Sequence, residues 1–508
     1  MDGESAVSAQ ARLVAALAAR LAREQPVQHL ETHISHVLLT PQFAYKIKKP
    51  VRLPFVDYSA AAARRHFCEE ELRLNARLAP TLYLGVSRIT GPADAPALDG
   101  DGETLDHAVR MRRFADGALW SERLAAGTLR PVHVDHLAAR LAAFHTGAAR
   151  APAGSPFGSA AERRRAALEA CASLTGQVDE VARAALEAWF EHRAGVLAPL
   201  WEERRAAGFV RECHGDLHLH NLLVDGDESL AFDGIEFNDR LRWIDVVDDI
   251  GFAAMDLMAH GRRDWAFRLL DGWLEATGDH AGVPALAFAL AYRATVRAEV
   301  AALQRQDALR ERYFALACEL AARQDARLLV THGLPGSGKS WCAARLLEAA
   351  GALRLRSDVE RKRLAGLAAQ ADSRAQGLDL YGAELTERTY AALLARAAPA
   401  LAAGWPVILD AAYLRRAQRD AAADFAAAAG VPFALLDCRA PMALLRERVA
   451  ARRGDASEAD LAVLENLARV QEPLGADEKR CALVVDTAAP FDAAALAARW
   501  QAAAATRP

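Results

Sequence analysis

One motif constrains the fold of this chain more than any other part of its sequence. Residues 333–340 match G-x-x-x-x-G-K-[S/T] at every fixed position, after a short apolar run at 327–331 and before an apolar helical segment that begins near Trp341. A strand, a glycine-rich turn and a helix in this order direct backbone N–H groups and a helix N-terminus at one point, which is an arrangement that holds phosphate. The predicted phosphate loop consists of Gly333, Leu334, Pro335, Gly336, Ser337, Gly338, Lys339 and Ser340.

Two side chains of this loop, and one residue further along the chain, fit a nucleoside triphosphate with Mg²⁺. Lys339 is placed to reach the β- and γ-phosphates of ATP, and the hydroxyl of Ser340 is a ligand for Mg²⁺. The apolar run 406–409 ends in Asp410, a position typical of a carboxylate that holds Mg²⁺ through water. The alternative for Asp410 is that it caps a helix after the strand.

Two further clusters are candidates for the chemistry of the same site. Asp358 is a candidate base for an acceptor hydroxyl, and Arg361 is a candidate for steadying substrate or phosphate. The equally weighted alternative for Asp358 is an N-cap of the following helix. A helical stretch near Gly454 carries four arginines that a lid would place on the transferring phosphoryl group, and a solvated basic helix face is the alternative. These arginines are Arg446, Arg448, Arg452 and Arg453.

Beyond residue 325 the chain alternates between short apolar runs and long helical segments, which predicts βα units and a parallel sheet. The runs are 327–331, 406–409, 433–437 and 482–485. We therefore expect an α/β P-loop domain at 326–508. This part of the chain resembles the P-loop kinases that include zeta toxins, gluconate-type kinases and polynucleotide kinases. The resemblance implies that Asp358 is the acceptor-activating base and that Arg448 or Arg452 contacts ATP.

A second motif set lies in the first half of the chain. Residues 214–221 and 230–234 match the H-x-D-x-x-x-x-N and D-x-G pair of protein-kinase-like phosphotransferases. Phosphoryl transfer to a hydroxyl needs one carboxylate near the acceptor oxygen, and an amide oxygen and a second carboxylate on Mg²⁺. Asp216, Asn221 and Asp233 supply these groups. The histidines of the motif also suggest zinc, which is less favoured because Asp216 and Asn221 already account for the loop.

Upstream of this motif set, the pattern predicts a small, mainly antiparallel lobe with one helix packed on it. We expect a hairpin at 33–39 and 43–48, further strands at 82–89 and 104–114, and a helix at 60–78.

A kinase-like site needs a lysine on a strand of this lobe and a carboxylate on its helix, because the pair orients the α- and β-phosphates of ATP. Lys46 and Lys48 fall on one face of the same strand, since side chains alternate with period two. Glu69, Glu70 and Glu71 lie on the predicted helix. Lys46 with Glu71 is the pair that we select; the alternatives are Lys48 and Glu70, or a solvated lysine strand end and acidic helix face.

Residues 30–320 resemble kinases of the aminoglycoside phosphotransferase type, the branch with His-Gly-Asp in place of His-Arg-Asp. The positions that carry the resemblance are Lys46, Glu71, Asp216, Asn221 and Asp233, together with the helix at 141–145. The turn at 40–42 departs from the family because it lacks a glycine-rich loop over the phosphates. The chain as a whole resembles bacterial proteins that fuse such a domain, here 1–325, to a P-loop kinase. The resemblance implies a bilobal α+β fold for the first domain.

Composition narrows the function classes. The 508 residues carry 62 Lys plus Arg against 66 Asp plus Glu, a net charge of −4, so there is no global basic field for nucleic acid or an anionic membrane. Seven cysteines without a C-x-x-C pair argue against a disulfide framework. The acidic start lacks the basic region of a secretory signal, and charges interrupt the apolar stretch 283–300. We expect a cytoplasmic protein without a membrane span.

Together the two motif sets predict a bifunctional enzyme that uses ATP and Mg²⁺ to phosphorylate hydroxyl-bearing small molecules at two sites. One alternative is a single active P-loop kinase, acting on a metabolite, a nucleotide sugar or a polynucleotide 5′-hydroxyl, with the first domain as nucleotide sensor. Another is a toxin-like kinase half restrained by its neighbour. The arginine-rich lid is only weak support for nucleic acid as acceptor.

Overall fold

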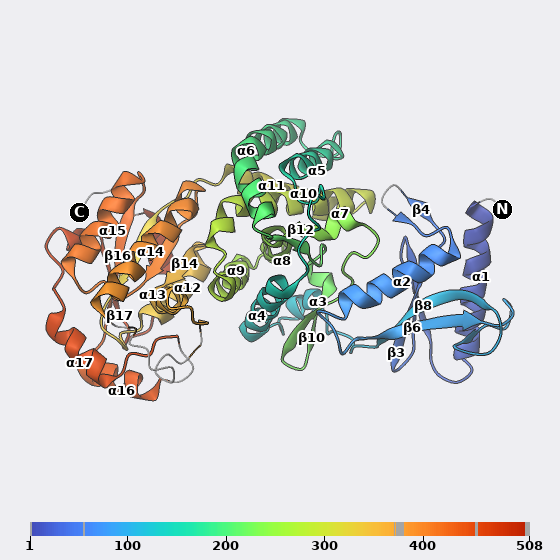
Figure 1. The fold of residues 1–508 in the computed structure, drawn as a ribbon, viewed down its shortest axis with the longest axis horizontal. Coiled ribbons are helices and arrows are strands. Elements are labelled where there is room, and N and C mark those ends of the chain that lie inside the picture. Colours follow the sequence, from blue (N-terminus) through green and yellow to red (C-terminus); the bar gives the residue numbers. More distant parts are fainter. Residues whose placement is uncertain are drawn as a thin grey trace. The chain divides into compact units, whose positions relative to one another are not determined.

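The structure of the protein is a computed structural model that describes residues 3–53, 56–369, 371, 380, 382–452 and 456–502 (Figure 1). The chain divides into two compact units, and each unit is assembled from two separate stretches. The first unit contains Met1–Glu162 and Leu200–Ala253, and the second contains Arg163–Pro199 and Ala254–Pro508. The domain boundary that we predict near residue 325 lies inside the second unit, so it does not coincide with the division into compact units. The boundary stays a prediction.

The first unit contains a six-stranded antiparallel sheet in the order β1-β2-β3-β8-β6-β7. Its strands are β1 (Gln28–Glu31), β2 (Ser35–Leu39), β3 (Phe43–Lys48), β6 (Tyr83–Thr90), β7 (Ala97–Leu98) and β8 (Thr104–Arg112). The predicted hairpin is confirmed, because β2 and β3 pair with Val37 opposite Lys46. The turn closes through the Thr40 backbone N–H, which donates to the carbonyl of Phe43. A separate strand pair is formed by β4 (Arg52–Leu53) and β5 (Val56–Asp57).

Two helices pack on this sheet, α1 (Gly3–Leu21) and α2 (Ala61–Asn75). α2 occupies most of the predicted helix and packs on the sheet face that carries Ala44. α1 was not expected from the sequence; it buries Leu17 on the face that carries Tyr45. Because successive strand residues point to opposite faces, Lys46 and Lys48 share the face of Ala44 and lie toward α2.

The rest of the first unit carries the His-Gly-Asp motif between short strands. Its elements are α3 (Trp120–Ala125), α4 (Pro131–Gly147), β9 (Val210–Glu212), η1 (Leu219–Asn221), β10 (Leu222–Asp225), β11 (Glu228–Ala231), α7 (Asp239–Arg242) and β12 (Trp243–Asp245). β10 and β11 form a hairpin, and β9 pairs with β12. Three helices have residues in both units, namely α5 (Ala160–Ala172), α6 (Glu180–Ala206) and α8 (Val246–Ala259).

A helical region precedes the parallel sheet of the second unit. It contains α9 (Arg263–Thr277), η2 (His280–Ala285), α10 (Leu286–Leu303) and α11 (Asp307–Ala322). α10 covers most of the apolar stretch at 283–300. In the part of the chain that the structure describes, no helix has both the length and the apolarity needed to cross a membrane.

The C-terminal sheet is parallel throughout, with the order β14-β15-β13-β16-β17. Its strands are β13 (Leu328–His332), β14 (Leu353–Arg356), β15 (Val407–Asp410), β16 (Phe433–Arg439) and β17 (Ala482–Asp486). Four of the strands confirm the predicted runs. β14 was not expected, because its alternating Leu and Arg residues lack an apolar run.

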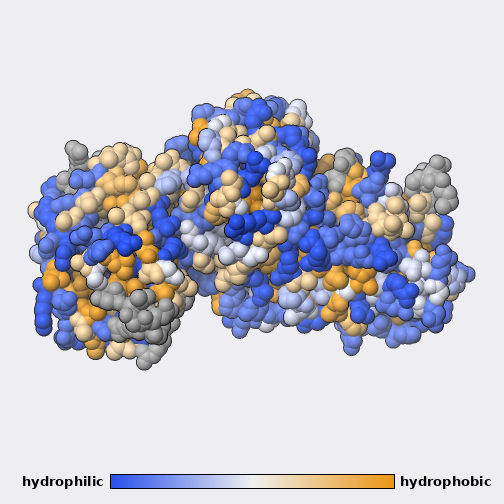
Figure 2. All heavy atoms as spheres, in the orientation of Figure 1, coloured by the Kyte–Doolittle hydropathy of each residue, from blue (hydrophilic) through white to orange (hydrophobic). Residues whose placement is uncertain are grey.

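Helices connect these strands, as βα units require. They are α12 (Lys339–Ala350), α13 (Ser357–Leu364), α14 (Ala383–Ala402), α15 (Arg416–Ala428), α16 (Met442–Ala451), α17 (Leu461–Val470) and η4 (Glu478–Arg480), and α18 (Ala493–Ala502) follows the last strand. β13 is buried at all five positions, which fits the central place of this strand in the sheet. On the face of the molecule drawn in Figure 2, hydrophilic residues cover most of the surface, with hydrophobic residues interspersed among them.

Candidate active sites

The His-Gly-Asp loop of the first unit brings Asp216 and Asn221 into direct contact. The side-chain amide of Asn221 donates to the backbone carbonyl of Asp216 at 3.0 Å and to its Oδ2 at 3.1 Å. Asp216 Oδ2 also lies 3.3 Å from Nε2 of His218. With its N–H groups engaged, Asn221 presents its amide oxygen as the ligand atom for a metal ion, while the Asp216 side chain remains one-third exposed.

Asp233 follows the β10–β11 hairpin and stands opposite the lysine strand. Its backbone has a φ of 60°, a left-handed conformation that Asp tolerates better than most residues. Its backbone N–H donates to the hydroxyl of Tyr83 at 3.1 Å, and its carboxylate forms an ion pair with Lys46. The Asp233 side chain is 43% exposed, so its carboxylate is open to a metal ion from the solvent side.

Lys46 and Lys48 both bind Glu71, which lies on α2. Lys46 Nζ is 3.0 Å from Glu71 Oε1, and Lys48 Nζ is 2.7 Å from Oε2. Burial alone would raise the pKa of Glu71, but the two ammonium groups outweigh it and lower this pKa to about 2. Lys48 is more deeply buried than Lys46 and also pairs with Glu236, which accepts from the hydroxyl of Tyr58. Sequence reasoning missed Tyr58 and Glu236, which lie 178 residues apart.

Asp249 on α8 holds the His-Gly-Asp loop from behind. Its carboxylate accepts from the backbone N–H groups of His214 at 3.1 Å and Gly215 at 2.8 Å, and lies 3.0 Å from Nε2 of His145. Gly215 has a φ of 85°, and a Cβ at this position would lie 2.6 Å from the carbonyl oxygen of Leu241. Only glycine therefore fits the loop at this position. Asp249 therefore braces the loop that carries Asp216.

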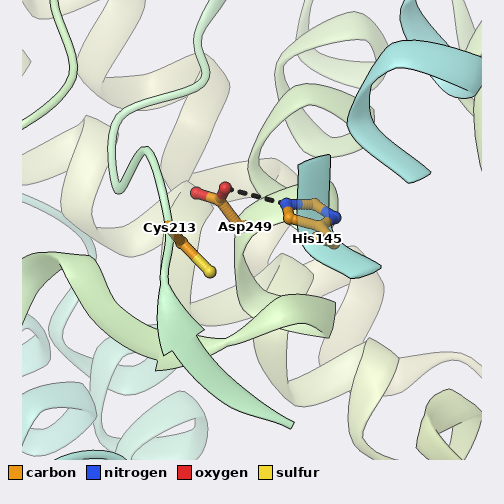
Figure 3. Close-up of side chains that lie close together, drawn as sticks. All are labelled: His145, Cys213 and Asp249. Carbon is orange, nitrogen blue, oxygen red and sulfur yellow. Dashed lines mark hydrogen bonds and ion pairs between the residues drawn. The ribbon is translucent and has the colours of Figure 1, made fainter. Parts of the chain in front are cut away.

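His145, Asp249 and Cys213 together have the composition of a metal site (Figure 3). Their contacts explain them without a metal ion, because the Asp249 oxygens already accept three N–H groups and the Cys213 thiol donates to the carbonyl of Ile244. Burial and the nearby Asp249 carboxylate raise the pKa of Cys213, which keeps the thiol protonated. The group therefore serves as a brace for the loop.

In the second unit, the loop 333–340 connects β13 to α12, as the motif predicts. Lys339 Nζ donates to the carbonyl of Leu334 at 3.0 Å, so the ammonium group lies within the curve of the loop. Burial lowers the pKa of Lys339. Arg448 on α16 supports the loop from outside, since its guanidinium donates to the carbonyl of Gly336 at 3.3 Å and to Thr487 Oγ1 at 2.8 Å.

Asp410 ends β15 and is almost fully buried. Its Oδ2 has no hydrogen-bond partner among the residues that the structure describes, and guanidinium nitrogens of Arg354 and Arg356 each lie 3.7 Å from it. A buried carboxylate oxygen without a donor fits a place in the coordination sphere of Mg²⁺, together with the Ser340 hydroxyl. The helix-capping alternative for Asp410 is wrong, because α15 begins at Arg416 with Arg415 as its N-cap.

Asp358 and Arg361 lie on the same helix, α13, and contact each other. Arg361 donates to Asp358 Oδ1 at 2.9 Å. The N-cap of this helix is Arg356, so the capping alternative for Asp358 is wrong, and Asp358 lies in the first turn, where a carboxylate is favoured by the helix dipole.

The four arginines of the predicted lid separate in the structure. Arg448 contacts the phosphate loop, Arg452 donates to Ser457 Oγ at 3.0 Å, and Arg446 forms an exposed pair with Glu465. Arg453 lies outside the described residues.

A cavity of about 550 Å³ opens beside the phosphate loop, at the ends of β13 and β16. Its lining includes Leu334, Ser337, His332 and Asp437, and the last two form a buried pair at 2.8 Å. Sequence reasoning missed this pair, because its members are 105 residues apart and belong to no motif.

Relatives match this chain over nearly its whole length. The uncharacterized protein Rv2004c of Mycobacterium tuberculosis (strain H37Rv) is 30% identical over 477 residues, which cover 91% of this chain and 92% of that protein. The uncharacterized protein Mb2027c of Mycobacterium bovis has the same identity and coverage. The chain belongs to the family of these mycobacterial proteins. The match extends across both parts of the chain.

Residues 328–474 match a family model described as an AAA domain. The matched range begins at β13 and contains the phosphate loop, Asp358 and Asp410. The predicted P-loop domain at the C-terminal end is therefore confirmed.

Solved structures resemble the two parts separately. A choline/ethanolamine kinase family protein from Mesorhizobium loti is 16% identical and covers 62% of this chain and 95% of its own, with a TM-score of 0.39. A gluconokinase from Sinorhizobium meliloti is 22% identical and covers 35% of this chain and 94% of its own, with a TM-score of 0.27.

The elements described above establish an α+β fold in the N-terminal part and an α/β P-loop fold with a parallel sheet in the C-terminal part.

Proposed function

We propose that the chain is a bifunctional enzyme that transfers the γ-phosphoryl group of ATP to hydroxyl acceptors at two separate sites. One observation carries the proposal: each half of the chain contains a lysine and two carboxylates at the positions that its motif assigns to phosphate, metal and acceptor. These are Lys46, Asp233 and Asp216 in the first half, and Lys339, Asp410 and Asp358 in the second. A domain that only sensed nucleotide would not require the acceptor carboxylate.

The same transfer is proposed at each site. The acceptor oxygen forms a bond to the γ-phosphorus, the bond from that phosphorus to the β,γ-bridging oxygen breaks, and ADP leaves. The acceptor proton passes to Asp216 at the first site and to Asp358 at the second. Mg²⁺, when bound, neutralises charge on the β- and γ-phosphates. Asn221 and Asp233 would hold it at the first site, and Ser340 and Asp410 at the second. In this proposal Arg361, Arg448 and Arg452 contact phosphate when the nucleotide is bound.

The acceptors are small hydroxyl compounds in this proposal, and the place of action is the cytoplasm. The seven cysteines are free thiols, and five of them are buried, which agrees with a reducing compartment that also supplies ATP.

A second candidate function is that the first unit only senses nucleotide and that phosphoryl transfer occurs at the P-loop site. Two observations favour it: the Asp233 carboxylate is paired with Lys46, and the turn at Thr40 lacks glycine. In this alternative ATP binding would have to separate Asp233 from Lys46 without transfer following.

The test compares intact wild type, Asp216→Ala and Lys339→Ala with Mg·ATP and three acceptor pools: hydroxyl metabolites, aminoglycosides and 5′-hydroxyl oligonucleotides. Mass spectrometry identifies each phosphorylated acceptor. Loss of a different product in each variant supports two kinases. If Asp216→Ala leaves every product intact while Lys339→Ala removes all of them, the first unit is a sensor and the bifunctional proposal is wrong.

A further inference from the structure

The C-terminal end of α9 is joined to the P-loop domain by a closely packed, charged contact. α9 precedes that domain in the chain, yet both belong to the same compact unit. Asp271 and Glu275 on α9 face Arg354 and Arg356, the two arginines of β14. The cavity beside Glu275, Arg354 and Arg356 has a volume of only about 10 Å³, so little space remains at this contact.

Arg354 connects α9 to the residues that we place around Mg²⁺. Its Nε and NH2 donate to the two oxygens of Asp271 at 3.2 and 2.7 Å. Its NH1 donates to the backbone carbonyl of Ser340 at 3.3 Å and lies 3.7 Å from Asp410 Oδ2. The side chain is only 9% exposed, so solvent screens these interactions weakly.

Arg356 repeats this arrangement one step along the strand. Its NH1 donates to Glu275 Oε1 at 3.0 Å, and its Nε lies 3.7 Å from Asp410 Oδ2. Because residues two apart on a strand share a face, both guanidinium groups stand between the carboxylates of α9 and the single carboxylate of Asp410.

The position of the arginines decides whether Asp410 is free to act as a metal ligand. At 3.7 Å neither arginine makes a hydrogen bond with Asp410, whereas a charge-assisted bond at about 2.8 Å would occupy the carboxylate oxygen. The acidic residues of α9 satisfy the arginine donors at distances of 2.7 to 3.2 Å and so oppose that closer approach.

We propose that Asp271 and Glu275 are positioning residues of the P-loop site, which hold Arg354 and Arg356 off Asp410 and thereby keep its carboxylate open to Mg²⁺. The inference rests on the proposed function of the P-loop site. It means that a helix outside the βα units of the P-loop domain sets the affinity of that site for the metal ion.

The same end of α9 is attached to the helix that carries Asp358. Arg363 of α13 donates to the backbone carbonyl of Glu275 at 3.0 Å, and Arg396 of α14 donates to the carbonyl of Gly278 at 3.4 Å. Arginines at the last carbonyls of a helix are favoured by its dipole. α9 is thus a common support for the metal carboxylate and for the candidate base.

The experiment measures binding of mant-ATP to the full chain by fluorescence while Mg²⁺ is titrated. The part of the signal that Lys339→Ala abolishes is assigned to binding at the P-loop site. Glu275→Gln removes the negative charge that holds Arg356, with little change of shape. We expect it to raise the Mg²⁺ concentration for half-maximal binding about fivefold or more, because a charge-assisted bond then competes for Asp410. Adding Arg356→Gln to Glu275→Gln is expected to return that concentration to near the wild-type value.

The matched control is Glu348→Gln, which removes an ion pair of 2.7 Å between α9 and α12 that involves neither Asp410 nor its arginines. It is expected to leave the Mg²⁺ dependence unchanged. An unchanged Mg²⁺ dependence in Glu275→Gln would overturn the inference, and so would a double variant as impaired as Glu275→Gln alone. Absence of any Mg²⁺-dependent, Lys339-dependent signal in wild type would overturn the proposed function of this site as well.

Discussion

His145 on α4 lies 3.0 Å through its Nε2 from Oδ2 of Asp249 on α8, although 104 residues separate them in the chain. The same carboxylate accepts two backbone N–H groups of the His-Gly-Asp loop, so three donors converge on one fully buried side chain. Burial would raise the pKa of Asp249, but the hydrogen bond and charge of His145 lower it, which keeps the carboxylate ionised as an acceptor.

Asp249→Asn tests whether this convergence positions Asp216. An amide offers one oxygen and places N–H donors where an acceptor is needed, so at least one loop N–H loses its partner. We expect the free energy of unfolding to fall by about 1–3 kcal/mol and the Asp216-dependent turnover to fall at least tenfold. Denaturant unfolding and product formation measure the two effects. Glu228→Gln, which removes an exposed ion pair with Arg140, is the control. If Asp249→Asn is destabilised but keeps full turnover, Asp249 contributes to stability and does not position Asp216.

Single substitutions distinguish the roles of Lys46 and Lys48, because each one leaves different carboxylates without a lysine partner. Lys48→Met strips a lysine that is 1% exposed from Glu71 and Glu236, both almost fully buried, and we expect it to cost about 3–5 kcal/mol of folding free energy. In Lys46→Met, Glu71 keeps its ion pair with Lys48 and Asp233 remains exposed to solvent, so we expect a smaller loss of stability. We also expect at least a tenfold rise in KM for ATP at the first site. Chemical unfolding and steady-state kinetics give both quantities. The opposite pattern, with ATP affinity lost only in Lys48→Met, would transfer the phosphate-orienting role to Lys48.

The pKa of Glu71 makes stability depend on pH in acid. Its pKa in the folded chain is lowered from 4.5 to about 2, so the unfolded chain takes up a proton at higher pH than the folded chain does. The stabilisation is complete above about pH 4.5 and is lost as the pH falls toward 2, by about 3 kcal/mol in all. Glu71→Gln cannot titrate, so the difference in unfolding free energy between wild type and Glu71→Gln should shrink from pH 6 to pH 3. Urea unfolding at intervals across this range measures the difference, and a constant gap would mean that Glu71 does not carry this dependence.

The parts of the fold that the sequence predicted are determined by residues close to one another in the chain. The phosphate loop lies within eight consecutive residues, and the hairpin of β2 and β3 follows from period-two patterning around a short turn. The Lys46 and Glu71 contact was also foreseen, because strand periodicity and the helix that follows place them on one side of the sheet. The second lysine at the same carboxylate left the choice between Lys46 and Lys48 open in the sequence, and both contacts are present.

The parts of the fold that the sequence did not predict depend on contacts with residues far away in the chain. β14 carries Arg354 and Arg356 where a buried strand normally carries apolar residues, and those arginines are accommodated by Asp271 and Glu275 more than 80 residues upstream. The alternative in which Asp358 caps a helix was wrong, because the helix begins at Ser357, directly after a strand that the sequence did not predict. α1 escaped because alanine-rich segments are abundant in this sequence and give no sign of which sheet face they cover.

Gly336 lies under α16, and its substitution tests whether this helix fixes the phosphate loop. Its φ is 81°, and a Cβ there would lie 2.7 Å from the carbonyl oxygen of Leu445 on α16, so either the loop or the helix must move. We expect Gly336→Ala to weaken mant-ADP binding at the Lys339-dependent site at least tenfold while the circular dichroism spectrum stays unchanged. Gly430→Ala is the matched control, because it has a similar positive φ of 67° with nothing within 4 Å of the added Cβ, and its cost is the backbone strain of about 1 kcal/mol alone. Equal ADP affinity in the two variants would show that contact with α16 does not set the shape of the loop.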